Sequence, residues 1–288
     1  MSVILITGTS SGIGLATAVH LARKRHDVYA AVRNPTTAGA LAEAMVKEPL
    51  PITRVTIDVD DASSVRRGVD EVLAKSGRVD VLVNNAGLGG GGPIEDVPID
   101  WAKTLFETNY FGAIRMIQAV LPGMRARGSG VIVNISSVAG RYVPAGHGHY
   151  AAVKHALEAA SEALALEVTP LGLRVVIIEP GVIVTPIFSK AKRFVAPDSP
   201  YAHHLRRLLL MYQRQLTNPT PPERVAETIE EAVTTPTPRL RWLVGDDAQR
   251  LVAGRGRISD EEFVADASAA TDAEWEALMR RRYGFEWP

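Results

Sequence analysis

A tyrosine and a lysine stand four residues apart in the segment GHGHYAAVK, residues 146–154. In a helix this spacing places Tyr150 and Lys154 on one face, one turn apart. A phenol beside an ammonium group is suited to proton transfer, because the positive charge favours the phenolate. From spacing alone two interpretations stay open: a working acid with its tuner, or the polar start of a surface helix.

A glycine-rich segment, TGTSSGIG at residues 7–14, directly follows a strand-like run and begins a helical pattern. Its glycines permit a tight turn and the close approach of a pyrophosphate, which would lie at the positive end of the helix. The spacing GxxxGxG differs from the usual GxGxxG, and such a turn can also be purely structural. In context we predict dinucleotide binding by Gly8, Ser10, Ser11, Gly12, Ile13 and Gly14.

The end of the second strand-like run, AAVRNP, bears on the choice of cofactor. In NAD-binding folds an acidic residue at this place binds the ribose 2′-hydroxyl. Val32 cannot accept a hydrogen bond, whereas the guanidinium of Arg33 suits a 2′-phosphate. We therefore predict that NADP(H) is preferred over NAD(H). The alternative is that Arg33 stacks on adenine or faces solvent.

Short apolar, β-branched runs alternate with longer helical patterns along the chain. Runs of this kind are typical of strands buried on both faces of a parallel sheet. The alternation predicts an α/β fold, a Rossmann-like doubly wound parallel sheet of about seven strands with helices on both faces. The predicted strands are 3–7, 27–32, 53–59, 79–85, 130–136, 173–180 and 240–245.

We expect residues 1–245 to form a single Rossmann-type catalytic domain. Within it, the segment at about 188–217 follows the carboxyl end of a strand and carries the apolar and basic run HHLRRLLLMYQRQL. A lid over the substrate and a pair of packed surface helices are both open interpretations of this segment. Residues 246–288 are predicted to be a helical tail on the same domain, with a capping box at 271–274.

Composition narrows the possible partners. Lys plus Arg and Asp plus Glu number 32 each in 288 residues, which argues against nucleic acid as a partner. The absence of cysteine excludes disulfides and thiol catalysis, and fits a cytoplasmic protein. No apolar run approaches the roughly 18 residues that a membrane-spanning helix needs, and the apolar start is too short for a signal peptide.

Six ordered motifs together resemble one family. The chain is similar to the short-chain dehydrogenase/reductase family, in its standard-length branch, from residue 3 to about 187. Within that family it looks most similar to 17β-hydroxysteroid dehydrogenases and related retinol and carbonyl reductases. The motifs are TGTSSGIG, the pair Asp58 and Val59, NNAG (84–87), NISS (134–137), YAAVK (150–154) and PGVIVT (180–185).

The resemblance implies a role for each of four catalytic residues. Tyr150 would be the general acid, and Lys154 would lower the phenolic pKa, ordinarily about 10, and bind the nicotinamide ribose. Ser137 would donate a hydrogen bond to the substrate oxygen, while its neighbour Ser136 is expected to be structural. Asn109, in TNYFG, would hold a water molecule against the lysine; a mid-helix asparagine is also often a local backbone bonder.

The resemblance also implies the surroundings of the cofactor and the substrate. Asn84 would support the sheet. The further cofactor-binding residues would be Asp58 and Val59 beside the adenine, Asn85, Ala86 and Gly87 along the adenosine, and Pro180, Gly181, Ile183 and Thr185 beside the nicotinamide. The predicted substrate pocket is Ser137, Val143, Pro144, His147, Tyr150, Ile187, Phe188, Leu210 and Met211.

The pair His147 and His149 has an HxH spacing that suggests a metal site. No third ligand stands nearby and the proposed chemistry needs no Lewis acid, so we expect no metal and place His147 at the substrate entrance. We predict an NADP(H)-dependent oxidoreductase that interconverts a ketone or aldehyde and an alcohol, with a bulky, apolar, steroid-like substrate.

Two alternatives stay open: an NAD-dependent alcohol dehydrogenase of the same family, and a dinucleotide-sensing regulator without turnover. We also expect a homodimer or homotetramer, formed through the helices that contain Asn109 and Tyr150.

Overall fold

The computed structural model describes residues 1–285. Its centre is a seven-stranded sheet in which every pair of neighbouring strands is parallel. The strand order is β3-β2-β1-β4-β6-β7-β9, and each strand overlaps one of the seven predicted runs. The predicted fold class is therefore confirmed. The strands are β1 Val3–Ile6, β2 Asp27–Val32, β3 Ile52–Thr56, β4 Val81–Asn84, β6 Gly130–Ile135, β7 Leu173–Pro180 and β9 Arg241–Val244.

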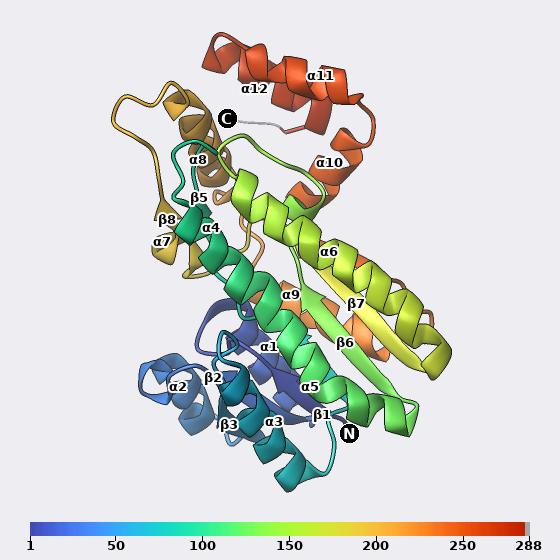
Figure 1. Cartoon of the computed structure of the whole chain (residues 1–288). Helices are drawn as coiled ribbons and strands as arrows, with labels where there is room; N and C mark the ends of the chain where they lie inside the picture. Colours follow the sequence, from blue (N-terminus) through green and yellow to red (C-terminus); the bar gives the residue numbers. More distant parts are fainter. Residues whose placement is uncertain (286–288) are drawn as a thin grey trace.

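Helices cover both faces of the sheet (Figure 1). Successive side chains of a strand point to opposite faces, so β1 contributes Ile4 and Ile6 to one core and Val3 and Leu5 to the other. The first core is closed by α1 Gly12–Arg23, α2 Gly39–Lys47 and α9 Pro222–Thr234. The second is closed by α3 Ala62–Ser76, α5 Gly112–Arg127 and α6 Gly148–Val168.

The strand order reverses between β1 and β4, which opens a crevice at the carboxyl ends of these strands. Buried amides tie the sheet to α6 beside this crevice. The Nδ2 of Asn84 donates to Oδ1 of Asn134 at 2.8 Å, and the Nδ2 of Asn134 donates to Oγ of Ser161 at 2.8 Å. Asn84 thus supports the sheet, while the residues that follow it reach the crevice.

The chain between β7 and α9 forms a separate layer over the crevice. It contains α7 Ile187–Lys190, β8 Lys192–Arg193 and α8 Ala202–Gln215. β8 pairs in parallel with β5 Gly90–Gly91, in the glycine-rich loop after β4. The sequence did not predict this small second sheet, because two-residue strands carry no periodicity.

Three helices follow β9: α10 Asp246–Arg255, α11 Asp260–Ala265 and α12 Asp272–Tyr283. The predicted capping box is present, since Thr271 and Glu274 bond reciprocally at the start of α12. Residues 286–288 of the predicted tail lie outside the described residues. The tail packs on α8 through a cluster of buried apolar side chains: Tyr142, Leu205, Leu208, Met211, Leu251, Met279, Tyr283 and Phe285.

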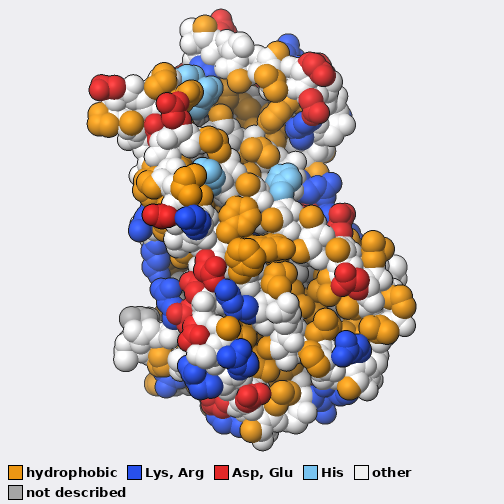
Figure 2. Space-filling model, viewed as in Figure 1, with side chains coloured by type: hydrophobic (Ala, Val, Ile, Leu, Met, Phe, Trp, Pro, Cys, Tyr) orange, Lys and Arg blue, Asp and Glu red, His pale blue; other side chains and the backbone are white. Residues whose placement is uncertain are grey.

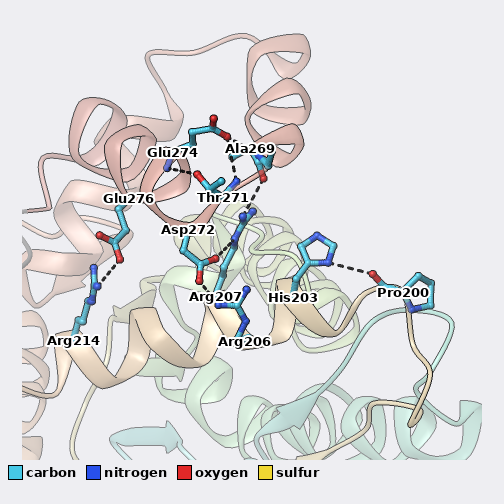
Figure 3. A network of polar contacts seen from close by, with 11 residues as sticks. Pro200, His203, Arg206, Arg207, Arg214, Ala269, Thr271, Asp272, Glu274 and Glu276 are labelled. Carbon is cyan, nitrogen blue, oxygen red and sulfur yellow. Dashed lines mark hydrogen bonds and ion pairs between the residues drawn. The ribbon is translucent and has the colours of Figure 1, made fainter.

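Arginines of α8 also bind the tail through ion pairs and hydrogen bonds (Figure 3). Arg207, only 4% exposed, donates to Oδ1 of Asp272 at 3.0 Å and to the carbonyl of Ala269 at 3.0 Å. Arg206 binds the same carboxylate from the exposed side, and Arg214 pairs with Glu276. The position of α8 therefore depends on the tail. Within residues 1–285, no helix is long and apolar enough to span a bilayer.

Candidate active site

A cavity of about 630 Å³ lies at the carboxyl ends of the central strands, beneath α7 and α8. Its wall contains the glycine-rich loop, Arg33, the three residues Ser137, Tyr150 and Lys154, and the segment that begins at Pro180. The fold thus brings together nearly all of the predicted site. The predicted residues that do not line the cavity are Gly14, Asn109, Val143 and Leu210.

The glycine-rich loop is held by backbone geometry. Gly8 has a φ of +71°, and a Cβ there would lie 2.8 Å from the Cα of Ala86, so a side chain would be both strained and obstructed. The Nδ2 of Asn85 donates to the carbonyls of Thr7 at 2.9 Å and Gly8 at 3.1 Å. Gly14 does not reach the cavity because it packs beneath the loop against Gly8 and Asn85.

This loop leads directly into the N-terminus of α1, whose N-cap Ser11 makes no side-chain cap hydrogen bond. Ser10, Ser11 and the following backbone line the cavity, where the helix dipole favours negative charge. A pyrophosphate fits a cradle of this kind. At the neighbouring corner, Val32 is buried at the end of β2, and Arg33 is exposed and lines the same cavity.

Tyr150 and Lys154 both belong to the first half of α6. The Nζ of Lys154 donates to the carbonyl of Ile135 at 2.9 Å and lies 5.7 Å from the centroid of the Tyr150 ring. Burial lowers the pKa of Lys154 to about 8, and the carboxylate of Glu158 acts in the opposite direction. Lys154 is therefore a cation that the protein holds out of water.

Burial raises the pKa of Tyr150 to about 12, and a hydrogen bond with Ser137 partly opposes this. In the cofactor-free protein desolvation of the phenolate is the larger effect, so the pKa of Tyr150 lies above its ordinary value, and the expected lowering by Lys154 stays a prediction. The phenol is consequently protonated at neutral pH. Ser137 is fixed at the turn after β6, where its Oγ accepts from the backbone N–H of Ala139 at 3.1 Å.

Asn109 lies in a π-helical turn, Glu107–Phe111, between α4 Ile99–Phe106 and α5. It is 3% exposed, its Oδ1 accepts from the N–H of Leu88 at 2.7 Å, and its Nδ2 donates to the carbonyl of Leu88 at 2.9 Å. Single π turns are frequent at functional sites. Here the turn directs the amide of Asn109 to the loop after β4, so its contact with the site runs through that loop.

His147, which the sequence placed at the substrate entrance, lines the part of the cavity beside α8. Its ring stacks on the Tyr150 ring with centroids 4.5 Å apart and an interplanar angle of 6°. Its Nδ1 lies 2.9 Å from the hydroxyl of Tyr212, and burial lowers the pKa of His147 to about 4. The imidazole is therefore neutral at pH 7 and connects the start of α6 to α8. Phe188 packs edge-on against Tyr212 at 5.5 Å.

Two residues, Val143 and Leu210, were wrongly predicted to line the pocket. Val143 is 39% exposed and lies outside the cavity, because the preceding Tyr142 takes the inward position and packs on Tyr283 at 5.4 Å. Leu210 lies with Arg206 on the outer side of α8. The predicted neighbours Pro144, Ile187, Phe188 and Met211 do line the cavity.

The sequence also missed several lining residues. Leu205 and Leu208 stand six and three residues before the predicted Met211, and this helical spacing could have identified the inner face of α8. Asp247 had no such signal. Asp247 lies in the first turn of α10, and its Oδ2 accepts a hydrogen bond from the N–H of Val182 at 2.6 Å. Its carboxylate lies so close to Gly181 that a Cβ there would collide with it, so only glycine fits. The other missed lining residues include Trp101, Tyr142, Leu209, Tyr212 and Leu251.

The family model for short chain dehydrogenases matches residues 2–195. The chain belongs to this family. The predicted resemblance is thus confirmed, and it extends to the expected relatives. Human retinol dehydrogenase 8 is 37% identical over 253 residues, covering 83% of this chain and 79% of that protein. Human 17-beta-hydroxysteroid dehydrogenase type 1 is 36% identical, covering 84% of this chain and 76% of that protein.

The solved structure of a short-chain dehydrogenase from Streptomyces avermitilis superposes with a TM-score of 0.81 at 36% identity, covering 97% of this chain and 98% of that one. The chain is therefore a short-chain dehydrogenase/reductase, an oxidoreductase that acts on alcohol or keto groups. Its cofactor class is the nicotinamide dinucleotides, which the cradle described above suits.

Proposed function

We propose that this short-chain dehydrogenase is an NADP(H)-dependent enzyme that interconverts a bulky, apolar ketone or aldehyde and the corresponding alcohol, with Tyr150 as the general acid and base. One observation carries the proposal. The phenol of Tyr150, the hydroxyl of Ser137 and the ammonium of Lys154 converge on the cavity that also contains the glycine-rich loop. The dinucleotide, when bound, supplies or accepts the hydride.

In the reductive direction Tyr150 donates its proton to the carbonyl oxygen, and Ser137 donates a hydrogen bond to the same oxygen. A pKa of about 12 keeps Tyr150 protonated at neutral pH, which is the form that donates a proton. In the oxidative direction the phenolate accepts the alcohol proton. Lys154 stabilises that phenolate and would hold the ribose hydroxyls.

The preference for NADP(H) rests on Arg33. It lines the cavity at the end of β2 with Val32 before it, so a cation stands where a carboxylate would bind the 2′-hydroxyl of NAD. Direct binding measurements with NADP⁺ and NAD⁺ test this assignment. Tighter binding of NAD⁺ would favour the NAD-dependent alternative.

The substrate class rests on the wall opposite Tyr150, where α7 and α8 contribute Ile187, Phe188, Leu208 and Met211. These side chains exclude water and offer few polar partners, which suits a bulky apolar substrate. The names of two relatives, a retinol dehydrogenase and a hydroxysteroid dehydrogenase, indicate substrates of the same character for those proteins. We infer that α8 acts as the lid predicted for the segment at about 188–217.

The test is NADPH consumption with a panel of steroid, retinoid-like, aromatic and small aliphatic carbonyls, for the wild type and Tyr150→Phe. We expect turnover on the bulky apolar class and a loss of at least about 100-fold in the variant, because the proton donor is removed. NADPH binding should be retained. If the wild type binds NADPH but reduces none of the panel, the dinucleotide-sensing regulator becomes the better interpretation.

We further propose a homodimer or homotetramer. Figure 2 shows hydrophobic side chains gathered on the face formed by α4, α5 and α6. On these helices and the turn between α4 and α5, Ile99 is 65%, Phe111 46% and Leu166 80% exposed, although large apolar side chains gain free energy when buried. A solution mass measurement should give a multiple of 31.0 kDa, and a monomer alone would contradict the proposal.

A further inference from the structure

A stripe of polar side chains runs along one face of α6 from the cavity to the surface. Tyr150, Lys154, Glu158 and Glu162 recur every four residues and therefore lie one above another. Lys154 is 6% and Glu158 4% exposed, whereas the Glu162 side chain is 54% exposed. The mechanism uses the first two members of the stripe and leaves the buried Glu158 unexplained.

Glu158 belongs to a network that joins α6 to two strands, β7 and β9. Arg241 of β9 binds Oε2 of Glu158 at 2.9 Å, Oε1 of Glu162 at 2.8 Å and Oε1 of Glu179, in β7, at 3.4 Å. Arg141 binds the same oxygen of Glu179 at 3.2 Å. Three carboxylates thus share two guanidinium groups. The ammonium of Lys154 is the third cation beside them, and with it the charges of this network balance.

Among the described residues, only one carboxylate oxygen of Glu158, Oε2, binds a guanidinium group. Within residues 1–285, its Oε1 is buried without a hydrogen-bond partner, as is the Oγ of Ser136. Both atoms lie beside Gly140, where a Cβ would be 3.2 Å from the first and 3.0 Å from the second. A buried carboxylate oxygen in this situation is costly unless a cation stands near it. Lys154, one helical turn away on the same face of α6, forms no salt bridge with Glu158, but the two charges attract each other across that turn.

We propose that Glu158, anchored by Arg241, is a positioning residue that keeps Lys154 positively charged beneath the catalytic tyrosine. The proposal rests on the function proposed for Lys154, whose charge stabilises the phenolate of Tyr150. Glu158 does not touch the cavity, so it acts through the lysine.

The groups around Lys154 decide the direction of the effect. On α6 it faces Tyr150 and Glu158, and from β6 it meets the carbonyl of Ile135. The charges behind Glu158 are those of Arg241, Glu179 and Arg141, from β9, β7 and the turn before α6. Burial lowers the pKa of Lys154 and Glu158 raises it. Without the carboxylate, Lys154 should therefore lose its proton at a lower pH.

The experiment is an NMR titration of the cofactor-free protein labelled with ¹³C at lysine Cε, with the Lys154 signal assigned by its loss in Lys154→Arg. In Glu158→Gln the midpoint should fall by about one pH unit. Glu162→Gln is the matched control, because it makes the same change on the same helix and the same arginine, but at the surface. It should leave the midpoint unchanged, and Glu158→Asp, which keeps the charge, should stay close to the wild type.

Equal midpoints in the wild type and Glu158→Gln would overturn the proposal, as would an equal shift in Glu162→Gln. If Glu158→Gln does not fold, Arg241→Gln replaces it, with the opposite expectation: removal of that cation should raise the midpoint. The titration needs no turnover, so its outcome is separate from the test with Tyr150→Phe. In the active enzyme, the alkaline loss of reductive turnover should move to lower pH in Glu158→Gln alone.

Discussion

The dinucleotide side of the cavity and its substrate side are held in place by different kinds of contact. On the dinucleotide side, the loop 7–14 is fixed by a positive φ at Gly8 and by hydrogen bonds that the side-chain amide of Asn85 donates to backbone carbonyls. On the substrate side, α8 is fixed by side chains of the tail, through the apolar cluster with Tyr283 and the ion pair of Arg207 with Asp272. Backbone geometry thus builds one half, and long-range packing of side chains builds the other.

This difference implies that the two halves can be altered separately. Because the tail meets the substrate wall at α8, changes there should alter the fit of the substrate without reaching the pyrophosphate cradle. Changes at the end of β2 should alter the choice of dinucleotide without reaching α8.

Arg33→Asp should weaken NADPH binding by about 100-fold, because it removes a charge-assisted contact and places a like charge beside the 2′-phosphate. NADH binding should be unchanged or tighter, since an acidic residue at this place suits the 2′-hydroxyl. Isothermal titration calorimetry with both dinucleotides measures this. Arg54→Asp, an exposed arginine on the neighbouring β3, is the control. An equal loss of NADPH and NADH affinity would contradict the assignment.

The same contrast explains what the sequence could reveal. The seven strands and the loop 7–14 were predictable because apolar periodicity and glycine spacing are local properties. Which side of a chain segment faces the cavity depends on distant partners. Val143 was misplaced since Tyr142 is drawn inward by Tyr283, 141 residues later in the chain, and Asp247 was missed because nothing near it in sequence indicates the loop at Gly181.

Arg207→Met should raise the KM for the bulky ketone identified in the panel by about 10-fold, because it removes a buried ion pair that holds α8 on α12. The dissociation constant for NADPH should not change. Steady-state kinetics and direct titration of NADPH separate the two effects. Arg206→Met is the matched control: Arg206 binds the same Asp272, but its side chain is 61% exposed, and such pairs contribute little.

A different outcome would remove the separation between the two halves. If Arg207→Met weakened NADPH as much as the ketone, the tail would support the whole crevice, and Asp247 on the loop at Val182 would be the route. If neither changed, the apolar cluster alone would hold α8.

Tyr212→Phe is the finest test, because it removes one hydroxyl and keeps the ring that packs on Phe188. The bond to Nδ1 of His147 is lost, and a net contribution of about 1 kcal/mol predicts a rise in KM of about fivefold. NADPH affinity should stay the same. The matched control is Tyr201→Phe, which removes an exposed hydroxyl bonded to Glu95 at the start of α8 and should change neither constant. If the KM is unchanged in Tyr212→Phe, the stack of His147 on Tyr150 holds without this hydrogen bond, and α8 contacts α6 through apolar packing alone.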